Sequence, residues 1–218
     1  MSPADQPLDS PIDVARIASI YDRTAAFYDG VVAEAQARPK QTAIELLDRR
    51  PGERFLEAGV GTGWAFERIV AATGLDGAVG LDVAPGMLDV ARQHVASARL
   101  VLGDARALPF RDACFDCLLV TYTLEVLPES EMLPLLRDCH RVLRQGGRIA
   151  VVNLTDGEGP DAAMTDDWKR RFADDPEYFG GARPLRAASI LQDAGFSAIA
   201  RTYVGGAWPS EVLLAQNL

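Results

Sequence analysis

Hydrophobic positions follow a helical period at the start of the chain. Apolar side chains recur there at close to three- and four-residue intervals, at Ile12, Ala15, Ile17, Ile20 and Tyr21. This spacing predicts an amphipathic helix from Ile12 to about Tyr28. A second helix is predicted over about Lys40 to Arg49, because the Pro51-Gly52 pair that follows it is a stop and turn signal.

From Arg54 onward the pattern changes to short apolar runs that alternate with amphipathic segments. The runs predict strands near 54–58, 78–82, 99–102, 115–121, 148–154, 198–204 and 211–216. Helices are predicted between them, near 63–72, 85–96, 129–144 and 185–194. This repeated order predicts an α/β fold in which helices cover both faces of a mostly parallel, seven-stranded sheet.

The pattern also predicts how the chain is organised. Residues 1–50 are expected to form an N-terminal helical extension whose first ten residues are disordered, and 51–218 the core, with a polar, irregular insertion at about 155–183. The N-terminus lacks the apolar stretch of a signal peptide, and no run approaches the roughly 20 apolar residues of a membrane span. We therefore expect a cytoplasmic protein.

Charge and cysteine content narrow the possible functions. The net charge of −9 disfavours a nucleic-acid partner, because such binding relies on Lys and Arg. Three cysteines are too few for a disulfide framework or a four-cysteine zinc site. Cys114 and Cys117 form a CxxC motif, but it overlaps a predicted buried strand, so we expect structural thiols and no metal site.

A glycine-rich loop follows the first predicted strand. Gly59, Gly61 and Gly63 alternate there, and residues without a Cβ let a ligand approach the backbone where a parallel strand ends. A dinucleotide-binding loop would place its third glycine at position 64, which is Trp64. No Gly-Lys-Ser/Thr element is present, which excludes a P-loop for nucleoside triphosphates.

Three successive predicted strands end in an acid. Glu57 precedes the glycine loop, Asp82 lies 25 residues after Glu57, and Asp104 lies one strand further on. A carboxylate at the position of Asp82 can accept hydrogen bonds from both ribose hydroxyls, which indicates a nucleoside ligand. Each acid alone could instead cap the following turn or helix. The set together with the glycine loop favours a binding site.

The run from Phe55 to Val152 resembles the class I S-adenosylmethionine-dependent methyltransferases, especially the small-molecule branch that includes quinone and phospholipid-headgroup methylating enzymes. The resemblance implies a Rossmann-like fold with an antiparallel last strand, an N-terminal helical lid and S-adenosylmethionine as methyl donor. It implies donor-binding roles for Glu57, Gly59, Gly61 and Gly63 at the methionine group, Asp82 at the ribose, Met87, Asp104 and Ala105 at the adenine, and Thr121 and Tyr21 nearby.

The sequence gives weaker evidence for the residues that would contact the methyl acceptor. The resemblance implies that the Tyr21-Asp22 and Tyr28-Asp29 pairs close over the donor, and Tyr28, Tyr122 and Glu125 are the candidate catalytic residues. Glu125 could serve as a base or as a counter-charge for an amine, and the alternative for it is a solvated turn before Pro128. For Tyr28 the alternative is helix packing.

The resulting hypothesis is methyl transfer by in-line displacement to nitrogen, oxygen or an activated carbon of a small molecule or lipid headgroup, by a monomer or homodimer. One competing hypothesis is a non-catalytic S-adenosylmethionine-binding protein, which would lack an acceptor cavity. The other is a nicotinamide-dependent oxidoreductase, against which Trp64 and Asp104 argue.

Overall fold

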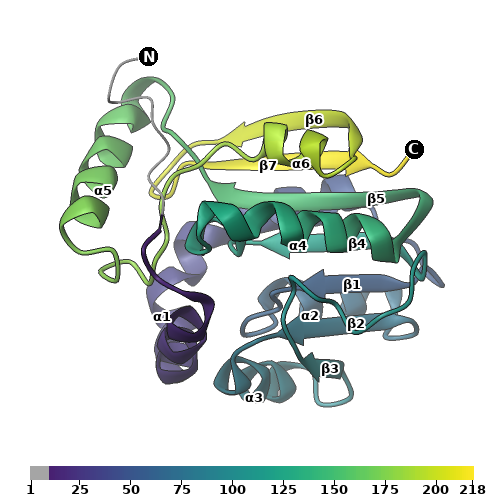
Figure 1. Ribbon diagram of the computed structural model, residues 1–218. Coiled ribbons are helices and arrows are strands. Elements are labelled where there is room, and N and C mark those ends of the chain that lie inside the picture. Colours follow the sequence, from purple (N-terminus) through teal and green to yellow (C-terminus); the bar gives the residue numbers. More distant parts are fainter. Residues whose placement is uncertain (1–9) are drawn as a thin grey trace.

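The computed structural model describes residues 10–218. Disorder was expected for residues 1–10. Of these, only Ser10 lies within the described range. The chain forms a single sheet with helices on both faces, as Figure 1 shows. None of the helices in the described range is long and apolar enough to cross a membrane.

The sheet has seven strands in the order β3-β2-β1-β4-β5-β7-β6. The first five in this order are mutually parallel, and β7 runs antiparallel to both of its neighbours. The strands are β1 (Phe55–Ala58), β2 (Ala78–Asp82), β3 (Arg99–Leu102), β4 (Phe115–Thr121), β5 (Leu143–Leu154), β6 (Ser197–Val204) and β7 (Ser210–Gln216). The predicted fold class, including the antiparallel last strand, is confirmed.

Two apolar layers hold the sheet between helices. The helices are α1 (Val14–Leu47), α2 (Trp64–Thr73), α3 (Pro85–His94), α4 (Glu129–Val142), α5 (Ala162–Asp174) and α6 (Ala188–Asp193), with short 3-10 turns η2 (Leu124–Val126) and η3 (Gly159–Asp161). Successive strand residues alternate between layers, so that Leu56 packs with the α4 and α6 side and Phe55 with the α2 side. Each layer buries one face of the sheet.

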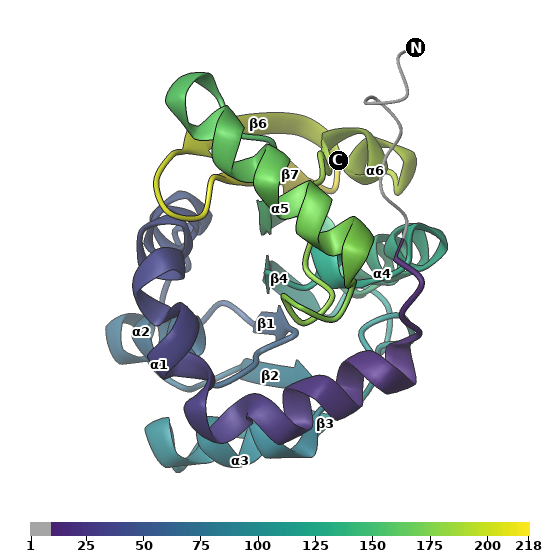
Figure 2. The ribbon, with the colours of Figure 1, turned by 90° about the vertical axis from the view of Figure 1, so that its left-hand side faces the viewer.

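The N-terminal region is one helix rather than two. We predicted helices at 12–28 and 40–49, but α1 is continuous over 34 residues and contains Pro39. Proline disfavours helical geometry at the preceding residue, which made a break before Lys40 the local expectation. Pro39 is buried, and the buried side chains of Ala43 and Leu47 pack against the sheet, which keeps the segment helical. In Figure 2 α1 wraps around the end of the sheet that faces the viewer.

The segment after β5 also differs from the prediction. We expected irregular structure through about residue 175, whereas α5 occupies Ala162–Asp174. Its buried side chains are Thr165, Trp168 and Phe172, which lie near helical spacing within an otherwise polar sequence. Both α1 and α5 lie at the end of the sheet where the parallel strands stop (Figure 1). The division into a lid, a core and an insertion stays a prediction.

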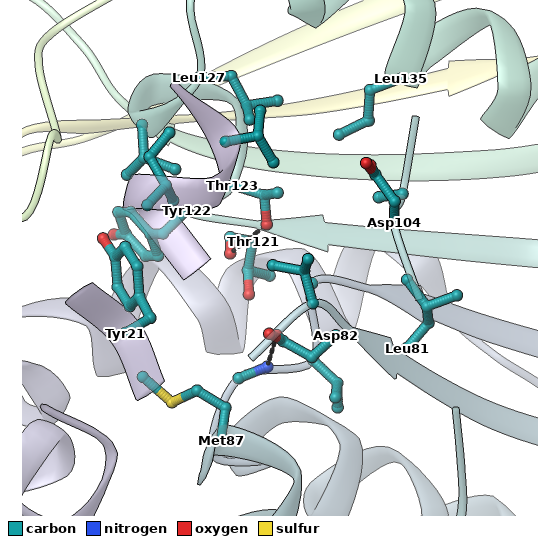
Figure 3. Close-up of a pocket in the computed structure, with 18 of the residues that line it drawn as sticks. Tyr21, Leu81, Asp82, Met87, Asp104, Thr121, Tyr122, Thr123, Leu127 and Leu135 are labelled. Atoms are coloured by element: carbon teal, nitrogen blue, oxygen red, sulfur yellow. Dashed lines mark hydrogen bonds between the residues drawn. The ribbon is translucent and has the colours of Figure 1, made fainter. Parts of the chain in front are cut away.

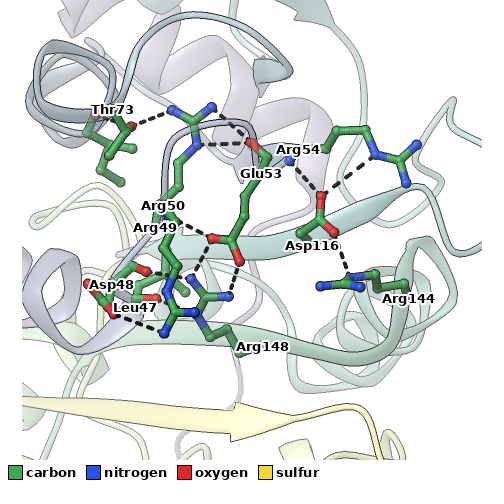
Figure 4. A network of polar contacts seen from close by, with 11 residues as sticks. Leu47, Asp48, Arg49, Arg50, Glu53, Arg54, Thr73, Asp116, Arg144 and Arg148 are labelled. Carbon is green, nitrogen blue, oxygen red and sulfur yellow. Dashed lines mark hydrogen bonds and ion pairs between the residues drawn. The ribbon is translucent and has the colours of Figure 1, made fainter.

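A polar network fixes the carboxyl end of α1 to the sheet (Figure 4). Arg148 of β5 donates to both carboxylate oxygens of Glu53, at 2.9 and 2.7 Å, and to the carbonyl of Asp48. Hydrogen bonds from Arg148 lower the pKa of Glu53 to about 2. Arg49 continues the network to the carbonyls of Glu53, Gly74 and Asp76. These contacts fix the position of the last turn of α1 relative to β5.

Candidate active site

The glycine loop has the backbone conformation that its sequence predicts. Gly59, Gly61 and Gly63 have φ values of 78°, 52° and 85°, a region that residues with a Cβ rarely adopt. A Cβ added at Gly59 would collide with the side chain of Thr123, whereas one added at Gly61 would meet no atom within 4 Å. Fold constraints therefore explain Gly59, and the open space beside Gly61 is available to a ligand.

A cleft opens at the carboxyl ends of β2, β3 and β4, beneath α1, and we call it the strand-end cavity (Figure 3). Its empty volume is about 840 Å³ including the open space at its mouth. Of the predicted donor-binding residues, it is lined by Tyr21, Gly59, Gly61, Asp82, Met87, Asp104, Ala105 and Thr121. The predicted set, apart from Glu57 and Gly63, thus lies in one cavity.

Asp82 ends β2 and holds two backbone groups. Its Oδ2 accepts from the Gly61 amide at 2.8 Å and its Oδ1 from the Ala84 amide at 2.9 Å. Burial raises the pKa of the carboxyl, and these hydrogen bonds partly offset that effect. A carboxylate has about four acceptor sites, so acceptor capacity remains for a ligand. Asp82 therefore performs the capping role that we considered as the alternative and still faces the cavity (Figure 3).

Two buried groups of opposite charge lie near the glycine loop. Glu57 is 1% exposed, and its Oε2 has no hydrogen-bond partner among the described residues. Burial raises its pKa. Lys40 of α1 lines the cavity with its ammonium 5.6 Å from the Tyr122 ring centre and 5.9 Å from that of Trp64. Burial lowers the pKa of Lys40, and the carboxylates of Glu57, Asp29 and Glu125 oppose this.

Sequence reasoning missed Lys40. The helix was predicted to begin at this residue, and nothing in the local pattern distinguishes its side chain from a solvated lysine at a helix start. Only the continuation of α1 through Pro39 turns Lys40 toward the glycine loop. The single available signal was that the chain has just two lysines among 22 basic Lys and Arg residues.

Asp104 is engaged by a neighbouring arginine. Arg106 donates to both of its carboxylate oxygens, at 3.0 and 2.6 Å, and also forms an ion pair with Glu131 of α4 at 2.8 Å. Burial tends to raise the pKa of Asp104, but the hydrogen bonds from Arg106 outweigh it and the pKa is lowered. Asp104 is therefore an ionised acid at the cavity rim, next to the buried Ala105.

Two tyrosine–aspartate pairs, seven residues apart, attach α1 to the site. Asp22 accepts from the Gly86 amide at the start of α3, and Asp29 accepts from the Thr62 hydroxyl of the glycine loop, each at 2.7 Å. Because seven residues make two helical turns, Tyr21 and Tyr28 then share a face, and their rings pack edge to face 5.8 Å apart. The aspartates dock the helix and the tyrosines line the cavity.

The end of β4 places an aromatic ring at the centre of the site. Tyr122 follows Thr121 with a φ of 53°, unusual for a residue with a side chain and characteristic of functional sites. Its hydroxyl lies 2.8 Å from the Ser210 hydroxyl, and burial raises its pKa. The ring, rather than the hydroxyl, is what Tyr122 presents to the site.

Glu125 is buried rather than solvated. It lies in η2 with 1% of its surface exposed, and its Oε1 accepts from the Leu154 amide at 3.2 Å while its Oε2 has no partner among the described residues. The alternative of a solvated turn is wrong, because Glu125 is buried and Arg183 donates to its carbonyl at 2.8 Å. Burial raises the pKa of Glu125 to about 8.

A second cavity, which we call the aromatic cavity, adjoins the first. Tyr21, Tyr28, Tyr122 and Val126 line both, so the two spaces meet at the tyrosines. The aromatic cavity also has an empty volume of about 840 Å³ including its mouth, and its further walls come from α1, η2 and the segment after α5. Tyr28 lies at the junction, where burial raises its pKa to about 12 and the Gln36 amide donates to its hydroxyl at 3.4 Å.

Comparison with known proteins agrees with this geometry. A family model described as a methyltransferase domain matches residues 55–147, from β1 to the start of β5. The domain contains the glycine loop, all three strand-end acids, Thr121, Tyr122 and Glu125, whereas α1 and most of the aromatic cavity come from outside it.

Two relatives indicate how far the likeness extends. The chain is 37% identical over 145 residues to a malonyl-[acyl-carrier protein] O-methyltransferase of Serratia marcescens, covering 65% of this chain and 53% of that protein. It is 31% identical over 143 residues to a demethylmenaquinone methyltransferase of Streptomyces griseus, covering 64% and 60%. The matched region therefore spans little more than half the length of these relatives.

A solved structure matches over nearly the whole chain. A Burkholderia thailandensis 1,6-didemethyltoxoflavin-N1-methyltransferase, with 1,6-didemethyltoxoflavin and S-adenosylhomocysteine bound, superposes with a TM-score of 0.68 and 19% identity, covering 97% of this chain and 92% of that one. At this identity the likeness concerns the fold. Together with the family match, it confirms the resemblance to class I S-adenosylmethionine-dependent methyltransferases of the small-molecule branch.

Proposed function

We propose that the protein transfers a methyl group from S-adenosylmethionine to a small-molecule acceptor. The observation that carries this proposal is that the strand-end cavity of the methyltransferase domain opens onto the aromatic cavity at Tyr21, Tyr28 and Tyr122. Direct transfer requires donor and acceptor to meet in line. A non-catalytic binding protein would not need the second cavity.

The residues of the strand-end cavity fit the donor group by group. Asp82 has acceptor sites left for the ribose hydroxyls, and the apolar side chains of Met87, Leu81 and Leu135 suit an adenine ring. Glu57 offers a buried carboxylate with an unpaired oxygen to the methionine ammonium. Lys40 supplies the opposite charge for the methionine carboxylate. Asp104 and Ala105 border the adenine end.

The donor, when bound, supplies a sulfonium methyl group that passes to a lone pair of the acceptor as the carbon–sulfur bond breaks. The chain's own residues position the acceptor and remove its proton. Tyr28 and Tyr122 confine the junction between the cavities, and Glu125 lines the aromatic cavity as a base that can take that proton. With its pKa raised to about 8, Glu125 is matched to proton transfer near neutral pH.

The setting of the reaction is part of the proposal. The net charge of −9 supports a small molecule rather than a nucleic acid as acceptor, because few cations are available for a phosphate backbone. We propose a cytoplasmic enzyme that acts as a monomer or homodimer.

Calorimetric titration of the purified chain tests the proposed function. S-adenosylmethionine and S-adenosylhomocysteine are expected to bind with micromolar affinity, and NAD is not. Binding of NAD alone, or of none of the three, would contradict the assignment of the glycine loop to a methyl donor.

A substitution at Lys40 tests the polarity of the donor site. Lys40→Met is expected to weaken S-adenosylhomocysteine binding about tenfold, because one charge-assisted contact to the carboxylate is lost. Binding of 5′-methylthioadenosine, which has the same nucleoside but no amino-acid group, should be unchanged. Calorimetry with both ligands measures the difference. Equal losses for the two ligands would show that Lys40 acts on the fold rather than on the carboxylate, and Lys169→Met is the matched control.

A further inference from the structure

The aromatic cavity has walls of a distinct composition. Aromatic rings from four parts of the chain line it, among them Tyr28 of α1, Tyr122 after β4, Phe179 after α5 and Trp208 before β7. Trp168 stacks behind Phe179 at 4.0 Å and meets Trp208 edge to face at 5.1 Å, which holds this wall rigid. Such walls suit a flat ring.

The apolar surface continues outward from the cavity. Phe27, Val31 and Tyr178 line its mouth and are 58%, 72% and 58% exposed, respectively. A contiguous patch of exposed apolar side chains indicates a binding surface, whereas single exposed apolar residues do not. A molecule bound in the cavity would therefore meet apolar surface also where it extends out of the cavity.

The cavity offers hydrogen-bond acceptors and no cation. Among the described residues none of its lining side chains is Lys, Arg or His, whereas Glu125 and Glu177 are carboxylates, and Glu177 is already paired with Arg16. Gln36 and Glu125 are each 1% exposed, and each keeps one side-chain oxygen without a described hydrogen-bond partner. The terminal torsions of Glu and Gln are soft, so either oxygen can turn to an occupant.

These features decide which chemistry the cavity accepts. An anion moved from water into this space loses hydration, and the neutral hydroxyl and amide groups of the lining supply no counter-charge for it. A neutral N–H or O–H group would instead satisfy an oxygen that is otherwise left unpaired, and leaving such a group unpaired is costly. The neighbouring cations lie outside its lining: Arg183 donates to the Glu125 carbonyl at 2.8 Å, and Arg16 is paired with Glu177. Lys40 lines the strand-end cavity, where three carboxylates act on it.

We infer that the acceptor is a non-anionic, ring-bearing molecule that presents an N–H or O–H group to Glu125 and Gln36 in the aromatic cavity. This inference rests on the proposed function, because it assigns that cavity to the acceptor. It excludes phosphorylated and carboxylated acceptors, whose charge the cavity cannot neutralise.

Three small probes of one shape test the inference on the full chain saturated with S-adenosylhomocysteine. Indole is neutral and carries an N–H group, benzofuran has the same outline without it, and indole-2-carboxylate adds a negative charge. Ligand-observed NMR titration is expected to show that indole binds about tenfold more tightly than benzofuran, and at least about tenfold more tightly than the carboxylate.

Variants test whether Glu125 and Gln36 cause the preference for indole over benzofuran. Glu125→Leu and Gln36→Leu should each reduce the preference for indole over benzofuran, and either variant suffices if the other does not fold. Glu34→Gln, an exposed substitution on α1 outside both cavities, should leave the preference unchanged. Equal binding of indole and benzofuran, tight binding of the carboxylate, or no binding of any probe would overturn the inference. Failure of S-adenosylhomocysteine itself to bind would instead overturn the proposed function.

Discussion

Replacing Asp82 with alanine is expected to weaken S-adenosylhomocysteine binding by about 1.5 to 3 kcal/mol, or roughly 10- to 150-fold, from the loss of charge-assisted hydrogen bonds. The structure adds a second reason for a large effect. The carboxylate also accepts from the Gly61 and Ala84 amides, so the variant loosens the glycine loop as well as the ribose site.

Calorimetry with a conservative companion separates these contributions. Asp82→Asn keeps one oxygen acceptor for the backbone but lacks the charge, and it should fall between the wild type and the alanine variant. Asp89→Ala, an exposed acid on α3 paired with Arg92, is the control and should bind normally. Unchanged affinity in Asp82→Ala would remove Asp82 from the donor site.

Glu125→Gln is expected to change how stability depends on pH. Burial raises the pKa of Glu125 from its ordinary value of 4.5 to about 8 in the folded protein. The folded state therefore binds this proton more tightly than the unfolded state does. This tighter binding contributes to the free energy of unfolding in full below pH 4.5, and the contribution is lost as the pH rises through about 8. For these two pKa values the loss between pH 6 and pH 9 is about 2 to 3 kcal/mol.

Urea unfolding of both proteins at the two pH values measures this contribution. The wild type should lose more stability than Glu125→Gln over the interval, because glutamine does not titrate. Burial also raises the pKa of Glu57, but Glu57 titrates in both proteins. Its contribution therefore cancels when the two proteins are compared. Parallel stability profiles would mean that Glu125 does not titrate with a pKa of about 8, and its proposed role as a base with a raised pKa would then be withdrawn.

Local patterns predicted the sheet because each strand carries its own signal. Strands 78–82, 99–102 and 115–121 have the predicted bounds, since short apolar runs between turn residues depend little on distant contacts. The break predicted before Lys40 failed for the opposite reason. Proline at position 39 is locally unfavourable in a helix, and burial of Ala43 and Leu47 against the sheet outweighs that preference.

The sequence by itself determined the strand-end half of the candidate site. A glycine loop and acids that end consecutive strands converge in any parallel α/β sheet, because parallel strands present their carboxyl ends at one edge. Only the tertiary structure decided the aromatic half. Gln36 and Trp208 lie more than 160 residues apart in the sequence, and each joins the aromatic cavity through its position in the fold. The place of Lys40 in the strand-end cavity was also decided only by the tertiary structure. The raised pKa of Glu125 likewise comes from burial that only folding produces, and Leu154 and Arg183, which folding brings to this residue, partly oppose the rise.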